Sequence, residues 1–290
     1  MTDPIVAQAT PPVATVLVPA WNEASVIRRT LSGLLASAGA DTLRIVVIAN
    51  ACTDATAAAA RMAAPQALVL ETPVPGKCNA LNLGLAHADP DLPVVVLDAD
   101  LQVGAKEILA LVAPLRAGRA LAACGRMEVS TDGASAPVRA WARAWARNPY
   151  FARGKFGGLF ALSPRGARRV FPLPPITADD EHIRRSFAAD EIALVPECRF
   201  VAQAPRTLPA LIKTRRRSLR GTRALQTARP AGEGARPMLR AALAHPTQWP
   251  DLAVFLGVAA WVRLLLALEP RSAERRWERD TTTRESAVQP

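Results

Sequence analysis

The first hundred residues alternate short apolar runs with segments in which apolar residues recur at helical spacing. Four runs predict buried strands, at residues 14–18, 44–48, 68–70 and 93–97. Helical spacing predicts helices at residues 24–37 and 79–87, and Asp54 stands where the N-cap of an alanine-rich helix between them is expected. Strands that alternate with helices predict an α/β fold, in which helices cover both faces of a mainly parallel sheet.

The rest of the chain is less regular. Its segments are a strand at residues 121–129, a Trp- and Arg-rich stretch at 138–153, a glycine-rich stretch at 154–160, a basic helix at 211–225, a linker at 228–237, an apolar stretch at 252–268 and a polar tail at 271–290. We therefore expect a flexible N-terminus at residues 1–12 and one α/β domain at 13–225. A helical C-terminal extension that ends in the polar tail is expected at residues 226–290.

Two carboxylates follow the fourth predicted strand directly, at Asp98 and Asp100. In open parallel sheets, ligands bind beyond the carboxyl ends of the strands. Two neighbouring anions in a crevice are costly unless a cation neutralises them, and a hard divalent ion such as Mg²⁺ or Mn²⁺ prefers oxygen ligands. The pair therefore predicts a metal site, and the alternative is an ordinary loop with a turn-forming aspartate.

Charge and composition narrow the function classes. The net charge of +11, from 36 Lys+Arg against 25 Asp+Glu, suits a solvated surface, a phosphate-bearing substrate or an anionic membrane surface. No zinc-finger or RRM-like pattern points to nucleic acid. The four cysteines are widely spaced and suit a reducing compartment, and no secretion signal is recognised at the N-terminus. Neither GxxxxGK[ST] nor GxGxxG follows a predicted strand, which excludes a P-loop kinase and a Rossmann dehydrogenase.

Five segments together resemble the motifs of family-2 glycosyltransferases of the GT-A fold. They are VLVPAWNE at residues 16–23, IANACTDAT at 48–56, GKCNALNLG at 76–84, DAD at 98–100 and TADDE at 177–181. The family patterns are P-x-x-N-E, an acidic loop ending S/C-T-D-x-T, G-K-x-x-A-L-N-x-G, the metal-binding D-x-D and a later E-D pair. The segments follow the family's order and spacing across roughly residues 14–225, so the resemblance implies a GT-A domain there.

The resemblance implies a nucleotide pocket built from the first three segments. Pro19, Trp21 and Glu23 would line it, and the Trp21 ring would stack on the base. Asn50 stands where the family commonly has an aspartate that reads a uracil edge; because an amide both donates and accepts, the base is left open. Lys77 would meet the base or the diphosphate. Core packing for Trp21 and a solvated charge for Lys77 are the alternatives.

The resemblance also assigns the metal and the acceptor side. Asp98 would contact the ribose or the metal, and Asp100 would bind the metal, Mg²⁺ or Mn²⁺, that bridges the donor diphosphate. Gly157 and Gly158 resemble the small-residue turn beside the acceptor pocket. Glycine at such a turn lets the backbone approach the sugar closely.

The acidic cluster at residues 179–181 lies in the place of the family's E-D pair. One carboxylate would deprotonate the acceptor hydroxyl as it attacks the anomeric carbon, a direct displacement that inverts the configuration. Alignment of the two aspartates with the E-D pair makes Asp180 the base, whereas alignment of Thr177 with the threonine that often precedes the pair makes Asp179 the base. We favour Asp180. The alternative is that the cluster only complements the positive end of a helix dipole.

The basic segment carries seven basic residues and no acids between Arg206 and Arg223. It sits where many membrane-embedded polymerising members have Q-x-x-R-W, with Thr214 in place of the glutamine and Ser218 in place of the tryptophan. Arg217 keeps the arginine and is expected to contact the departing diphosphate. The two replacements argue against a processive polymer synthase. The alternative is a solvated or lipid-facing basic helix.

The apolar stretch at residues 252–268 is interrupted by Arg263 and ends at Glu269 and Pro270. A membrane span needs about 20 apolar residues, and a central arginine is expensive there. We therefore expect this helix to lie on a membrane surface or to pack on the rest of the protein. A single span is the remaining alternative.

We therefore expect an inverting, metal-dependent glycosyltransferase of the hexosyltransferase type, with a hydroxyl-bearing glycan or lipid-linked acceptor. Cell-surface polysaccharide or glycolipid synthesis is the expected context, in the cytoplasm or peripherally at the inner face of the cell membrane. Two alternatives stay open. A sugar nucleotidyltransferase would need a glycine-rich, arginine-bearing loop after the first strand, and the PAWNE loop has no glycine. A non-catalytic family member would bind a membrane surface or a partner.

Overall fold

The computed structural model describes residues 11–148, 155–225, 245–269 and 282–284. Most of the predicted flexible N-terminus at residues 1–12 lies outside this part of the chain. The predicted linker at 228–237 also lies outside it, and so does the polar tail at 271–290 apart from residues 282–284.

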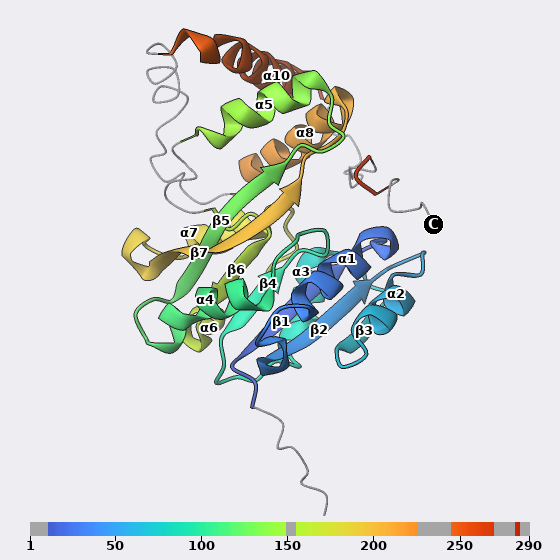
Figure 1. Ribbon diagram of the computed structural model, residues 1–290, viewed down its shortest axis with the longest axis vertical. Coiled ribbons are helices and arrows are strands. Elements are labelled where there is room, and N and C mark those ends of the chain that lie inside the picture. The colour runs from blue at the N-terminus through green and yellow to red at the C-terminus, as the bar shows by residue number, and fades with distance from the viewer. Residues whose placement is uncertain (1–10, 149–154, 226–244, 270–281, 285–290) are drawn as a thin grey trace, which may run out of the picture.

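A seven-stranded sheet forms the centre of the molecule, in the order β3-β2-β1-β4-β6-β5-β7 (Figure 1). The strands are β1 (Ala14–Ala20), β2 (Leu43–Asn50), β3 (Leu68–Thr72), β4 (Val94–Leu97), β5 (Ala122–Ser130), β6 (Leu159–Leu162) and β7 (Ile192–Gln203). Strands β3, β2, β1 and β4 are parallel, and β7 is parallel to β5. Only β6 opposes its neighbours, β4 and β5, so the predicted mainly parallel sheet is confirmed.

Helices cover both faces of this sheet, as the alternating pattern predicts. One face carries α1 (Ala24–Leu35), α2 (Thr56–Ala63) and α4 (Ala105–Arg116), and the other carries α3 (Lys77–Leu85), α6 (Pro164–Val170) and α7 (Asp179–Arg185). Side chains of a strand point alternately to its two faces. In β1, Val16 and Val18 therefore enter the core under α1, whereas Leu17 enters the core under α3. Short 3₁₀ turns occur at Ala40–Thr42, Ala189–Glu191 and Pro246–Gln248.

A third apolar cluster lies beyond the upper ends of β5 and β7 in Figure 1. It joins α5 (Ala136–Ala146), α8 (Leu208–Ala224) and α10 (Trp249–Leu268). Trp141 of α5 and Leu211 of α8 are buried there with Val258 and Val262 of α10. The predicted apolar helix is thus present, and one of its faces packs on α5 and α8.

The structure corrects the role of Asp54. Helix α2 begins at Thr56 with Ala55 as its N-cap, so Asp54 is one position too early to be the cap itself. Its two oxygens instead accept hydrogen bonds from the backbone N–H groups of Thr56, at 3.0 Å, and Ala24, at 3.1 Å. Asp54 therefore ties the start of α2 to the start of α1.

Candidate active site

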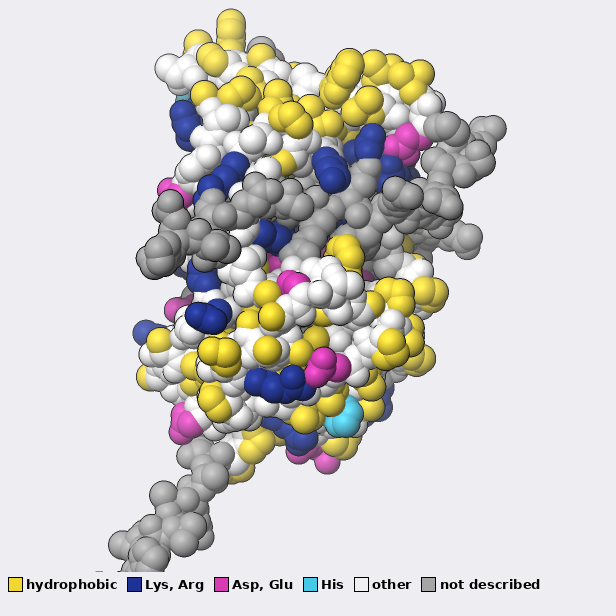
Figure 2. All heavy atoms as spheres, turned by 90° about the vertical axis from the view of Figure 1, so that its right-hand side faces the viewer, with side chains coloured by type: hydrophobic (Ala, Val, Ile, Leu, Met, Phe, Trp, Pro, Cys, Tyr) yellow, Lys and Arg dark blue, Asp and Glu magenta, His cyan; other side chains and the backbone are white. Residues whose placement is uncertain are grey.

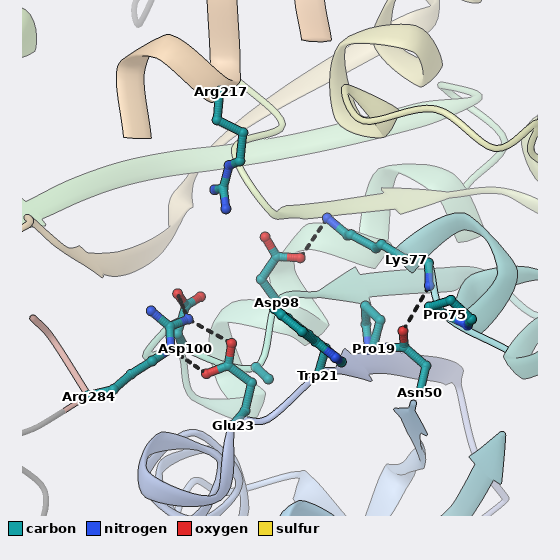
Figure 3. Close-up of a pocket in the computed structure, with 12 residues that line it drawn as sticks. Pro19, Trp21, Glu23, Asn50, Pro75, Lys77, Asp98, Asp100, Arg217 and Arg284 are labelled. Carbon is teal, nitrogen blue, oxygen red and sulfur yellow. Dashed lines mark hydrogen bonds and ion pairs between the residues drawn. The ribbon is translucent and has the colours of Figure 1, made fainter. Parts of the chain in front are cut away.

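A cavity of about 370 Å³ opens where β1, β2 and β4 end. Its lining residues are Pro19, Trp21, Glu23, Asn50, Pro75, Gly76, Lys77, Asp98, Ala99, Asp100, Arg217 and Arg284 (Figure 3). All eight residues that the sequence predicts for nucleotide-sugar and metal binding are among them. The predicted acceptor residues Gly157 and Gly158 and the candidate bases Asp179 and Asp180 lie outside this lining.

The loops after β1 and β2 hold each other in place. The amide of Asn22 donates to Thr53 Oγ1 at 3.1 Å and accepts from the Thr53 N–H at 2.7 Å. The hydroxyl of Thr56 accepts from the Glu23 N–H at 2.8 Å. These polar motif residues therefore bind one another, and the sequence alone does not distinguish such a role from ligand binding.

Asn50 is a second link, buried at the end of β2. Its Nδ2 donates to the Ala20 carbonyl at 2.9 Å, and its Oδ1 accepts from the Gly76 N–H at 3.1 Å. An aspartate at this position would place an oxygen against the carbonyl of Ala20, and two acceptors cannot bond each other. The amide therefore fits this position, because it fixes both the end of β1 and the turn before α3 at the wall of the cavity.

Lys77 connects the cavity to α7. Its Nζ lies 2.7 Å from Asp98 Oδ1 and 2.9 Å from Asp179 Oδ2, and the Asp179 side chain is only 6% exposed. Burial by itself would lower the pKa of Lys77, but the charges of Asp179 and Asp98 raise it well above its usual value. Lys77 is therefore a permanent cation shared by two carboxylates, which is incompatible with a solvated surface charge.

Asp98 is the more buried of the two predicted metal ligands. Burial raises the pKa of its carboxyl to about 6, and the cation of Lys77 limits that rise. The backbone N–H of Asp98 donates to the Gly158 carbonyl at 2.8 Å. A Cβ at Gly158 would lie 2.4 Å from Asp98 Oδ2, and the residue has a φ of +86°, so both space and backbone favour glycine. In this structure the predicted acceptor-side glycine makes room for Asp98.

The acidic cluster divides into three environments along α7. Asp179 faces Lys77, whereas Glu181 receives hydrogen bonds from Arg184 and Arg185 that hold the pKa of Glu181 below its usual range despite burial. Burial raises the pKa of the Asp180 carboxyl, and the neighbouring charge of Asp179 raises it further. Lys155 and Lys77 act in the opposite direction. The Asp180 carboxylate therefore binds a proton more readily than an ordinary aspartate does.

The carboxylates at the cavity fit a divalent ion that binds together with a diphosphate. Asp98 and Asp100 would offer hard oxygen ligands to such an ion, and the Asp100 side chain is 43% exposed at the cavity wall. Within the ranges that the structure describes, no group of three or more His, Cys, Asp or Glu side chains is arranged to hold a metal. Mg²⁺-type sites commonly use one or two carboxylates and complete their coordination with substrate phosphates and water. The two aspartates match that kind of site.

Two cations of the site have no counterpart in the sequence predictions. Arg284 contacts Glu23 and Asp100 inside the cavity (Figure 3). Lys155 lies with its Nζ 4.8 Å from the centre of the Trp145 ring, and burial lowers the pKa of Lys155 to about 8. Arg284 comes from a segment that reads only as a charged tail, and Lys155 from a glycine-rich stretch. Neither carries a motif that could reveal it.

The family described as Glycosyl transferase family 2 matches residues 15–167. A mannosyltransferase from Pyrobaculum calidifontis, solved with GDP-Man and Mn²⁺, is 27% identical, with a TM-score of 0.56 over 89% of this chain and 79% of that one. Glucosyl-3-phosphoglycerate synthase from Mycobacterium tuberculosis, solved with phosphoglyceric acid, shares the fold at 21% identity, with a TM-score of 0.52 over 72% of this chain and 78% of that one. No curated protein matches the chain.

Proposed function

Because this chain belongs to glycosyltransferase family 2, we propose that it transfers a sugar from a nucleotide-diphosphate sugar to a hydroxyl acceptor with inversion at the anomeric carbon. The observation that carries the proposal is the cavity at the ends of β1, β2 and β4, into which the predicted donor residues converge. Three carboxylates and three cations line it, at Glu23, Asp98, Asp100, Lys77, Arg217 and Arg284. Such a mixture suits a diphosphate together with a cation.

The donor would lie with its base among Pro19, Trp21 and Asn50 and its diphosphate toward Arg217. Arg217 points into the cavity from α8, and a guanidinium suits phosphate oxygens (Figure 3). A divalent ion, Mg²⁺ or Mn²⁺, held by Asp100 and Asp98, would offset the charge that grows on the leaving diphosphate. The Pyrobaculum mannosyltransferase, solved with GDP-Man and Mn²⁺, supports a nucleotide-sugar donor that binds together with a divalent ion.

Asp180 would act as the base on the acceptor side. Its carboxylate takes the proton of the acceptor hydroxyl while that oxygen attacks the anomeric carbon. The bond from the anomeric carbon to the diphosphate breaks, and the nucleoside diphosphate leaves with the bonding electrons. The raised pKa of Asp180 favours this role, and the 2.9 Å contact between Asp179 and Lys77 favours a charge-balancing role for Asp179. Gly157 and Gly158, beside Asp98, would border the acceptor.

We further propose that the enzyme works at an anionic membrane surface, in synthesis of a cell-surface glycan or glycolipid. The outer side of α10 exposes large apolar side chains, at Trp249, Leu256, Trp261, Leu264 and Leu268. Figure 2 shows hydrophobic side chains gathered at this upper end of the molecule, with Lys and Arg side chains below them. Arg143 and Arg147, which pair with Asp251 at the start of α10, are 55% and 43% exposed.

Helix α10 is also long enough to be considered as a membrane-spanning helix. Among the described helices, the segment Pro246–Leu268 is 23 residues long and contains an 18-residue window with a mean hydropathy of 2.0, enough to cross a bilayer by length and composition. One face of α10, however, packs on α5 and α8 through Val258 and Val262. This packing, together with the exposed Arg263 near the middle of the helix, which would be costly inside a bilayer, favours a helix that lies on the membrane surface. The four cysteines are free thiols, which suits the cytoplasmic side of the membrane.

The test is donor binding and turnover with a panel of UDP-, GDP- and dTDP-sugars. Calorimetry measures binding in Mn²⁺, in Mg²⁺ and in EDTA, and release of nucleoside diphosphate measures slow hydrolysis without an acceptor. One donor is expected to bind and hydrolyse only with metal, and Asp100→Ala should abolish both. If no nucleotide sugar binds with metal present, the transferase proposal fails and a non-catalytic role replaces it.

A further inference from the structure

Arg284 belongs to the C-terminal segment but lies inside the donor cavity. Its Nε and Nη2 donate to the two carboxylate oxygens of Glu23, at 2.8 and 2.7 Å. Nη2 also donates to Asp100 Oδ2 at 3.0 Å. The side chains of Arg284 and Glu23 are only 14% and 12% exposed. The guanidinium is therefore a fixed part of the cavity wall and differs from the solvated charges of an ordinary tail.

A second contact ties the same residues to the part of the chain that leads into α8. Thr282 Oγ1 accepts a hydrogen bond of 3.0 Å from the backbone N–H of Arg206, in the connection between β7 and α8. Helix α8 also carries Arg217, which lines the cavity. Residues 282–284 thus join the α8 side of the cavity to the loops that follow β1 and β4.

The two carboxylates that Arg284 contacts are not equivalent. Glu23 binds the guanidinium through both oxygens, a geometry that is strong and specific. Asp100 offers one oxygen and is 43% exposed, and it is the residue to which the proposed metal would bind. A divalent ion on that carboxylate would lie next to the guanidinium, and the two positive charges would repel each other. Asp100 can therefore serve the ion or Arg284, while Glu23 keeps the arginine at the wall.

We propose that Arg284 is a donor-site residue that neutralises Asp100 until a divalent ion takes its place. The inference rests on the proposed metal-dependent function and extends it, because it assigns residues 282–284 to the donor site. Without donor, the arginine competes with the ion for one carboxylate. The ion then binds weakly on its own, and the diphosphate, which adds its own oxygens to the coordination, completes the exchange.

The test measures Mn²⁺ affinity of the full-length protein without nucleotide, from the electron paramagnetic resonance signal of free Mn²⁺. Arg284→Ala and Arg284→Gln, which keeps a shorter, polar but uncharged side chain, are compared with wild type. Both should bind Mn²⁺ about three- to tenfold more tightly, the range expected when a charged hydrogen bond to the ligand is removed. Arg199→Ala is the control, because it removes the same charge from an exposed pair with Glu128. It should leave the affinity within twofold of wild type (~0.4 kcal/mol).

The Asp100→Ala variant distinguishes failure of the inference about Arg284 from failure of the proposed metal site. If wild type binds Mn²⁺ in an Asp100-dependent way and both Arg284 variants bind it equally or more weakly, the inference is overturned while the proposed function stands. If neither wild type nor the variants bind Mn²⁺, even with GDP or UDP present, the metal part of the proposed function fails and the inference fails with it. A gain in affinity that disappears in the Asp100→Ala background supports the exchange, because it traces the effect to that carboxylate.

Discussion

The ammonium of Lys77 lies 2.9 Å from Oδ2 of Asp179, so the donor cavity and the acidic helix α7 share one cation. The same nitrogen is 2.7 Å from Asp98, which lines the cavity. A change on the acceptor side can therefore reach the donor carboxylate through Lys77. This coupling is the basis of the first prediction.

Lys77→Met should lower both stability and donor affinity. It leaves two buried or half-buried carboxylates without their cation, and breaking a buried pair of this kind costs about 3–5 kcal/mol. Urea unfolding measures the loss of stability, and calorimetry with Mn²⁺ and the donor measures the affinity, which should fall at least about tenfold. Lys106→Met, at an exposed position of α4, is the matched control. Equal stability of the two variants would contradict the role assigned to Lys77.

Asp180→Asn should lower kcat about 10³-fold or more, because it removes the proton acceptor and retains the shape of the side chain. Donor binding should stay within twofold of wild type (~0.4 kcal/mol), since Asp180 does not line the donor cavity. Asp179→Asn should instead weaken donor binding, because it removes one of the two carboxylates that position the Lys77 ammonium beside Asp98. Steady-state kinetics and calorimetry on both variants separate the two roles. The reverse pattern would make Asp179 the base.

The pH profile of kcat should show an acid limb above the ordinary aspartate pKa of about 3.9. Burial raises the pKa of Asp180, and activity requires the deprotonated form, so activity falls as pH drops through that raised value. Lys155 lowers the pKa of Asp180 and is itself protonated below about pH 8. Lys155→Met should therefore move the acid limb to higher pH. Lys106→Met provides the comparison, and an unmoved limb in Lys155→Met would argue against Asp180 as the titrating group.

The hydrophobic pattern predicts strands β1 to β4 well because these strands are continuous apolar runs. Residues 44–48 and 93–97 fall within or at the edges of β2 and β4, and the chemistry follows directly at their ends. The hydrophobic pattern does not predict β6 and β7. β6 has only four residues, and β7 includes Pro196 and Glu197, with an irregular register opposite Gly125. Pairing with β5, which lies far away in sequence, makes these segments strands.

In the candidate site, too, the sequence identifies some residues and not others. Motif spacing identifies Trp21, Lys77 and Asp98, since each follows a predictable strand or begins a predictable helix. Spacing does not identify Arg284, because its place depends on a return of the chain to Glu23 that no local pattern encodes. Nor does it reveal that Asn22 and Thr53 bind each other. Contacts between distant segments are invisible until the fold brings them together.

Asn50→Asp should destabilise the protein by about 1–3 kcal/mol and weaken donor binding. The substitution replaces the amide N–H group that donates a hydrogen bond to the Ala20 carbonyl with a buried oxygen that can only accept one. The oxygen that accepts from the Gly76 N–H is retained. Thermal unfolding and donor titration measure the two effects. Asn79→Asp, at an exposed contact with the Val74 carbonyl, is the control and should have a smaller effect. A variant with unchanged stability would show that the bond to Ala20 contributes little.

Trp261→Glu combined with Leu264→Glu should weaken binding to anionic vesicles at least about tenfold. The two side chains are 50% and 47% exposed on the outer side of α10, and burial of such apolar area drives interfacial binding together with attraction between basic residues and anionic lipids. Co-sedimentation with vesicles of phosphatidylglycerol and phosphatidylcholine measures the loss. Met62→Glu, which changes a 71% exposed apolar side chain on α2, tests whether any added acid has this effect.

Because α10 meets α5 and α8 through its other face, the double variant should keep its thermal stability and donor binding. Loss of both would instead mean that the exposed face supports the fold, and wild-type binding that persists in high salt and on neutral vesicles would favour a spanning helix over a surface one.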